Sequence, residues 1–176
     1  MTSQDLITRY NKGERDFSNA ELAGADLREA VLRGIILCGA NLEKANLSWA
    51  NLEEADLSGA KLANAQLNAT HLRAANLSNA NLPNAKMKTV GLKDANLAGA
   101  ILKGAVLVGA KFQGANLRGA DLSRCHLDGA DFSGADTREM KLQFAELTNV
   151  VGLEITEEQK SWKAVDKEDK QLGAAE

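Results

Sequence analysis

Residues 40–59, ANLEKANLSWANLEEADLSG, are four consecutive pentapeptides of the form Ala-x-Leu-x-x. The same register continues without a slip from Phe17 to Leu147, and its 27 central positions hold 22 Leu, with Phe, Met or Thr at the other five. The position two residues earlier holds Ala in 21 of the 27 copies. A repeat this regular indicates a protein built by stacking copies of one small unit.

The five-residue spacing excludes a long amphipathic helix. At about 100° per residue, successive Leu side chains would advance by about 140° and spread around the whole helix. In an extended segment, Ala and Leu two residues apart point to the same side, and the residue between them points away. The remaining two residues must turn the chain, and the last of them is Gly in 11 copies, where the missing Cβ favours turn geometry.

Short extended segments joined by regular turns predict an all-β solenoid. Stacked coils would let each segment pair with its equivalents above and below, while Leu fills the axis and Ala leaves room for it. Burial of one Leu contributes roughly 2 kcal/mol, against an ordering cost of about 1–2 kcal/mol per residue. Stability should therefore be collective, and isolated repeats should not fold.

The Ala-(Asp/Asn)-Leu-x-x repeat resembles the signature of the pentapeptide-repeat family, over about three quarters of the chain. This resemblance implies a right-handed quadrilateral β-helix with four pentapeptides per coil, and hence about seven coils for the 27 repeats. The opening of the tract, RYNKGERDFSNAEL from Arg9, is also similar to the start of soluble members that are common in cyanobacteria.

Both ends of a solenoid expose unpaired strands and a bare core, so each end needs a cover. We expect an N-terminal capping helix in residues 1–14 and the pentapeptide-repeat β-helix in residues 15–152. The helix would use an apolar side formed by Leu6, Ile7 and Tyr10 and would end near a glycine. Two apolar residues in outward slots near this end are expected to be covered by it, namely Val31 and Ile36.

For residues 153–176 we expect a C-terminal capping helix and tail. Thr156 and Gln159 have the spacing of a capping box, and Trp162 and Val165 would form an apolar side together with Leu172. This helix could cover the last coil or mediate dimerisation through this end, so both a monomer and a dimer remain open.

The composition fits a soluble domain with no membrane segment. The net charge is −3, aromatic residues make up 4% of the 176 residues, and no apolar run approaches the roughly 20 residues of a membrane span. The N-terminus, MTSQDLITR, lacks a hydrophobic signal core, and a cytoplasmic location is therefore expected. Cys38 and Cys125 would lie more than four coils apart, about 20 Å, which is too far for a disulfide.

No constellation of residues predicts catalysis. His71 and His126 are the only histidines of the chain, and four pentapeptides per coil would place them on different sides, nearly three coils apart, so we expect no metal site. Carboxylate pairs such as Glu53 and Glu54 have no enclosing pocket, because a packed axis leaves no cavity for a substrate. No nucleophile stands beside a base. We therefore expect no cofactor and interpret the chain as a non-enzyme.

Four outward-facing apolar residues form the candidate partner-binding surface. Val106 and Val108 are an outward-pointing pair, Ile101 lies one corner away, and Trp49 occupies a corner slot otherwise held by Gly or a polar residue in most copies. Trp is the residue type most enriched at interface hot spots. The alternative is structural, because β-branched residues are tolerated strand formers and Trp49 could simply lie over Ala69.

The outer surface also carries a modest group of lysines. Lys86, Lys88 and Lys93 fall in one coil, with Lys103 and Lys111 close above them. Acidic residues are interleaved on the surface, the chain is acidic in total, and no aromatic residue lies among these lysines to stack a base. Nucleic-acid binding is therefore not expected.

Two functions of different classes fit such a rod. The first is a non-enzymatic protein-interaction scaffold with an unidentified protein partner; the resemblance includes members that act in developmental control in cyanobacteria by binding a regulator or its peptide inhibitor. The alternative is DNA mimicry, as in quinolone-resistance members, which resemble acidic rods of duplex size and bind DNA gyrase, a topoisomerase. The mixed charges and the uninterrupted repeat favour the scaffold. A stable filler without a specific partner is a third option.

Overall fold

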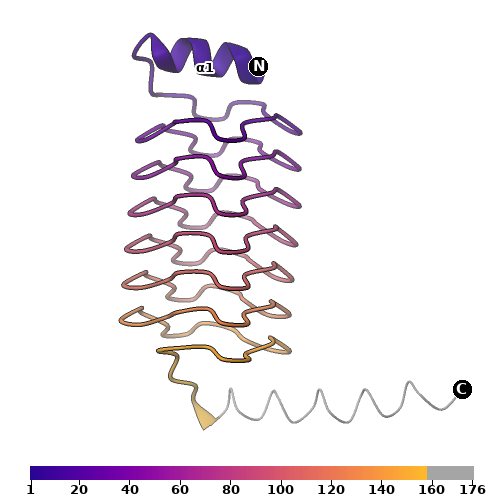
Figure 1. Ribbon diagram of the computed structural model, residues 1–176, viewed down its shortest axis with the longest axis vertical. Helices are drawn as coiled ribbons and strands as arrows, with labels where there is room; N and C mark the ends of the chain where they lie inside the picture. Colours follow the sequence, from indigo (N-terminus) through magenta and orange to yellow (C-terminus); the bar gives the residue numbers. More distant parts are fainter. Residues whose placement is uncertain (158–176) are drawn as a thin grey trace, which may run out of the picture.

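The repeat tract forms a rod of stacked coils in the computed structural model, which describes residues 1–157 (Figure 1). The helix α1, Ser3–Asn11, lies across the N-terminal end of the rod. The C-terminal helix expected around Trp162 lies outside the described residues. Within residues 1–157, no helix has the length and apolarity that crossing a membrane requires.

Every coil contains four pentapeptides, because the backbone pairs residues that are twenty apart. Parallel bridges of this spacing run from the pair Asp16 and Ile36 to the pair Asp131 and Val151. Each bridge is a single residue pair, since two residues later the chain already turns. The rod thus has four walls, which we number by their first outward residue: first wall from position 16, second from 21, third from 26 and fourth from 31.

The axis of the rod is a closed apolar core. Every residue of the Leu column from position 22 to position 132 is at most 1% exposed. Phe112 and Phe132, which replace Leu in successive coils, stack with their ring centroids 4.7 Å apart. Two polar groups in the Ala column are also satisfied, because Thr70 Oγ1 donates to the Leu47 carbonyl at 2.8 Å. Cys125 Sγ likewise donates to a backbone carbonyl, at 3.0 Å.

All 27 corners between pentapeptides have the same backbone conformation. The residue two places after each Leu-column position has a positive φ, from Asn19 at 56° to Asn149 at 55°, and 16 of these residues are not glycine. A hydrogen bond from the following N–H closes the turn, as from Ala50 to the Leu47 carbonyl at 3.0 Å. Positive φ at the third turn position is typical of type II turns, which favour Gly or Asn there.

Residues 1–13 contain a well-capped helix whose apolar side rests on the first coil. Thr2 and Asp5 form a capping box at the start of α1. Leu6 is fully buried, and the Tyr10 hydroxyl donates to the Arg33 carbonyl at 2.7 Å. The helix therefore ties its own C-terminal half to the corner of a coil.

The expectation that α1 covers Val31 and Ile36 is wrong. Val31 is 67% exposed and Ile36 is 36% exposed. The helix lies across the end of the rod (Figure 1), whereas Val31 and Ile36 occupy exposed outward positions of the fourth and first walls. An outward slot is therefore not reached by an end cap, however close it is in sequence.

We predict that Thr89→Gly stabilises the fold. Thr89 is exposed and has a φ of 53°, and a left-handed residue other than glycine costs about 1–2 kcal/mol. Glycine loses more conformational entropy on folding, which offsets about 0.5–1 kcal/mol of this gain in stability. The free energy of unfolding, measured by chemical denaturation, should rise by about 0.5–1 kcal/mol.

Two variants control for the direction of this effect. Gly119→Ala adds a Cβ at a φ of 67° with no atom within 4 Å of it, and should lower the free energy of unfolding by about 1 kcal/mol through strain alone. Ala98→Gly, at a position without positive φ, should also be destabilising, by about 0.5–1 kcal/mol. The interpretation is contradicted if Thr89→Gly destabilises the protein as Ala98→Gly does.

Candidate functional site

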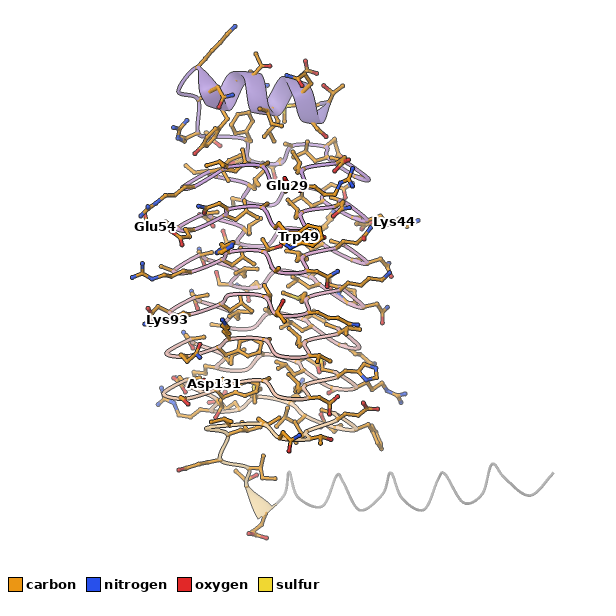
Figure 2. All side chains as sticks on the ribbon, in the orientation of Figure 1. Glu29, Lys44, Trp49, Glu54, Lys93 and Asp131 are labelled. Carbon is orange, nitrogen blue, oxygen red and sulfur yellow. The ribbon has the colours of Figure 1, made fainter. Side chains whose placement is uncertain are left out.

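Trp49 stands at the corner between the third and fourth walls. Its side chain is 58% exposed, and its φ is 59°. The Trp49 N–H donates to the Asn68 carbonyl of the next coil at 3.0 Å. Figure 2 shows Trp49 directly along the rod from Glu29, the equivalent corner residue one coil earlier. A large aromatic side chain is thus presented to solvent on a backbone that is held in place.

Val106 and Val108 lie on the third wall, where they line a hollow of about 460 Å³. They are half-buried, so they form part of the floor of a depression and do not protrude. The rest of the lining is polar or basic, from Asn68, Lys86, Lys88 and His126. The hollow therefore combines an apolar pair with positive charge.

The four candidate apolar residues do not form one site. Ile101 is 45% exposed on the second wall, where it is bridged to Asn81 and Asp121. Trp49 and Val106 lie near each other around the rod but three coils apart along it, or about 14 Å at the usual strand spacing. The structure brings Val106 and Val108 together and leaves Ile101 apart from them.

A second hollow, of about 450 Å³, opens on the fourth wall. Its centre is Gly91, whose absent side chain leaves a gap between the bridged neighbours His71 and Lys111. Arg73 and Lys93 are also among its lining residues. The sequence analysis does not predict this hollow. A signal was present, because Gly91 is the one glycine among the 27 slots between the Ala and Leu columns.

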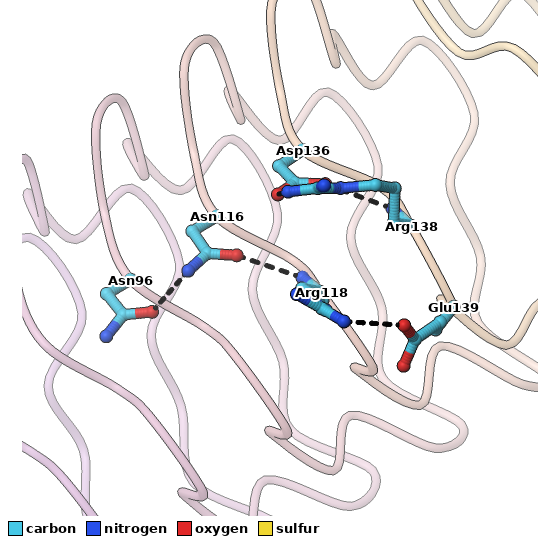
Figure 3. Close-up of polar contacts among 6 residues, drawn as sticks. All are labelled: Asn96, Asn116, Arg118, Asp136, Arg138 and Glu139. Carbon is cyan, nitrogen blue, oxygen red and sulfur yellow. Dashed lines mark hydrogen bonds and ion pairs between the residues drawn. The ribbon is translucent and has the colours of Figure 1, made fainter.

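Most arginines on the rod have an acidic partner. Arg33 approaches both Glu53, at 3.8 Å, and Glu54, at 2.5 Å, and the hydrogen bond from Arg33 lowers the pKa of the Glu54 carboxyl. Figure 3 shows two further pairs on consecutive coils, Arg118 with Glu139 at 2.8 Å and Arg138 with Asp136. The hydrogen bond from Arg138 lowers the pKa of Asp136 to about 2.

The cations that line the two hollows differ from these arginines. In the part of the chain from residue 1 to residue 157, no ion pair involves any of the five cations that line them. The five are exposed and come from both walls: Arg73, Lys86, Lys88, Lys93 and Lys111. Positive charge is therefore concentrated around one corner of the rod, although Glu53 also lines the fourth-wall hollow and, after the hydrogen bond from Arg33, the charge of Arg73 helps to lower the pKa of Glu54.

The described residues hold no group of three or more His, Cys, Asp or Glu side chains that could bind a metal ion. His71 and His126 lie on different walls, and His126 Nδ1 is 2.7 Å from a carboxylate oxygen of Glu146. Both hollows are open depressions on the outer walls, outside the closed axis. This arrangement favours binding through the surface over chemistry in an enclosed site.

The two cysteines have opposite environments. Cys38 is exposed on the first wall, where Ser58 Oγ lies 3.4 Å from its sulfur. Cys125 is buried in the Ala column, and burial raises the pKa of its thiol to about 12. Only one of the two sulfurs can therefore react readily in the folded protein.

The sequence profile of the pentapeptide repeats (8 copies) matches residues 16–53, 50–88, 92–129 and 115–151. The chain belongs to the pentapeptide-repeat family. No curated protein matches the chain in sequence. The resemblance drawn from the Ala-(Asp/Asn)-Leu-x-x repeat is thus confirmed.

Solved structures of other pentapeptide-repeat proteins are similar to this one. HetL, a protein involved in heterocyst differentiation regulation from the cyanobacterium Nostoc sp. strain PCC 7120, is 26% identical; the match covers 86% of this chain and 93% of HetL, with a TM-score of 0.50. Rfr23 from the cyanobacterium Cyanothece 51142 is 28% identical over 85% of this chain and 99% of its own, with a TM-score of 0.27. QnrB1, a plasmid-mediated fluoroquinolone resistance protein, is 20% identical over 92% of this chain and 89% of its own, with a TM-score of 0.42.

We predict that a thiol reagent at neutral pH modifies Cys38 and spares Cys125 in the folded pentapeptide-repeat protein. The thiolate is the reactive form, and Cys125 is both inaccessible and held as the neutral thiol. Mass spectrometry after brief alkylation should show one adduct on the folded protein and two after denaturation. Modification of Cys125 at the same rate as Cys38 would contradict the closed axis, and Cys38→Ser provides the matched control.

Proposed function

We propose that this pentapeptide-repeat protein is a non-enzymatic protein-interaction scaffold. The observation that carries the proposal is the exposure of Trp49 on a corner fixed by hydrogen bonds to the Leu47 and Asn68 carbonyls. A rigid aromatic residue loses little conformational entropy on binding, and Trp is the residue type most enriched at interface hot spots. Because the axis is filled by side chains, a partner can bind only to the outer surface.

A regulatory role is supported by the similarity to HetL, which covers most of both chains. HetL is involved in heterocyst differentiation regulation, and we propose a comparable regulatory task, with a protein partner, for the present chain. We place the protein in the cytoplasm, as a monomer or as a dimer through its C-terminal end. We further propose that the tract makes about seven right-handed coils with a helical cap at each end, in keeping with a register of twenty residues per coil.

We predict that affinity capture from the native host identifies a partner protein. Its binding should require residues of the third wall and of the corner between the third and fourth walls. Trp49→Ala or Val106→Asp/Val108→Asp should remove at least one captured protein, because the first change deletes an aromatic contact and the second places charge in the apolar floor. The thermal midpoint of Trp49→Ala should be unchanged, since the side chain is exposed.

Val31→Asp is the matched control, because Val31 is an exposed β-branched residue in the same kind of slot but close to the N-terminal end. It should leave the captured proteins unchanged. Identical capture profiles for all the variants and the unmodified protein would remove Trp49, Val106 and Val108 from the proposed interface.

DNA mimicry is the alternative, and the charges of the third and fourth walls oppose it. A mimic of duplex DNA needs a dense acidic surface, whereas five exposed cations line the two hollows around one corner of this rod. We predict that micromolar protein does not inhibit supercoiling by DNA gyrase in vitro. Inhibition that survives charge reversal of Lys86 and Lys93 would support mimicry and contradict the scaffold.

A further inference from the structure

We propose that the two hollows form one docking surface for an acidic, aliphatic segment of a partner protein. We call this surface the basic saddle and define it by five cations: Arg73, Lys86, Lys88, Lys93 and Lys111. The inference rests on the proposed scaffold function and names the chemistry of the partner.

The hollows lie on the two sides of a corner formed by small residues. Asn68 lines the hollow on the third wall, and the next residue, Ala69, lines the hollow on the fourth wall. One coil later, Lys88 and Thr89 stand in the same relation. The corner residue of the coil after that is Gly109. Because Ala, Thr and Gly form the ridge between the hollows, one extended partner segment can contact both.

The charge of the saddle is one-sided. Across residues 66–114, the outward and corner positions of these two walls include one acidic residue, Asp94, which stands at the corner between the fourth and first walls. Glu53 lines the edge of the fourth-wall hollow but lies 3.8 Å from Arg33. Arg73 and Lys93 stand in equivalent positions of successive coils, whose strands are about 4.8 Å apart, so their charges repel one another, whereas Glu53 and Asp131 stand one coil from Arg73 and Lys111. An anionic partner would relieve this repulsion.

Apolar groups within the saddle distinguish the type of anion. Val106 and Val108 form the floor beside Lys86 and Lys88, which suits an aliphatic side chain flanked by carboxylates. Trp49 precedes Ala69 by one coil in the same corner column and so stands at the edge of the saddle. Single-stranded nucleic acid is instead bound by successive aromatic platforms, and among residues 66–114 the walls carry none. An acidic protein segment therefore fits best.

The experiment uses the full-length protein and a short fluorescent peptide that repeats the triplet Glu-Leu-Glu. Fluorescence anisotropy at low salt should show saturable binding, and a peptide of Gln-Leu-Gln triplets should bind at least about tenfold more weakly. Lys86→Glu/Lys93→Glu changes one cation in each hollow and should also weaken binding of the acidic peptide at least about tenfold.

The matched control is Lys61→Glu/Lys141→Glu, because both lysines are exposed on the second wall and the change in net charge is identical. Affinity for the acidic peptide should change by less than about twofold, since screening limits charge effects to about 10 Å at moderate salt. All four substituted side chains are exposed, so thermal midpoints should confirm that both variants fold.

Three results would overturn the proposal. The first is failure of the unmodified protein to bind the acidic peptide, and the second is an equal loss of peptide affinity in the two double variants. The third is tighter binding of a single-stranded or duplex oligonucleotide with the same dependence on Lys86 and Lys93. The last result would assign the saddle to nucleic acid. If capture still depends on Trp49 while the peptide does not bind, the scaffold survives and the acidic partner is rejected. Peptide binding without any captured protein would instead reject the scaffold and retain the saddle.

Discussion

The closed axis is the constraint on which the rest of this molecule depends. A Leu-column side chain enters the axis every five residues, and the Ala column provides the space, so that the interior is sealed from position 22 to position 132. Parallel pairing of residues twenty apart holds each coil on the next. Because side chains fill the axis completely, any substrate, metal or partner must be met on the outer walls. Function in such a rod is a property of columns of outward residues.

The corners add a second constraint, which makes the surface rigid. Each corner residue is left-handed, and 16 of the 27 are not glycine, so the sequence accepts a cost of about 1 kcal/mol or more at many positions. Packing of the axis must compensate for it. The Trp49 side chain, for example, is displayed on a backbone held by one hydrogen bond to the Asn68 carbonyl of the next coil and one within the turn, from Ala50 to Leu47. This rigidity suits recognition, because less entropy is lost when a partner binds.

The sequence predicts the repeat architecture well because the axis imposes its period on every copy. The inward columns and the corner position could be read directly from the spacing of Leu, Ala and Gly. The hollows could not, since they depend on which outward residues become neighbours once twenty-residue coils are stacked. Gly91 matters only because His71 and Lys111 flank it in space. The expectation that the end helix covers Val31 fails for the same reason. The helix and this outward slot lie close in sequence but face different directions.

Comparison of the walls shows how one fold can support different surfaces. On the first wall the outward amides form a ladder, in which Asn96 donates to Asn76 at 3.2 Å. Asn116 likewise donates to Asn96 at 3.2 Å (Figure 3). Those amides hydrogen-bond to one another along the wall. Around the corner of Ala69 and Thr89, cations accumulate without such pairing. Since most of the inter-coil hydrogen bonds are made by the backbone, many outward residues can change with little effect on stability. The positive charge of the saddle is therefore not required by the fold, in keeping with the binding role proposed for it.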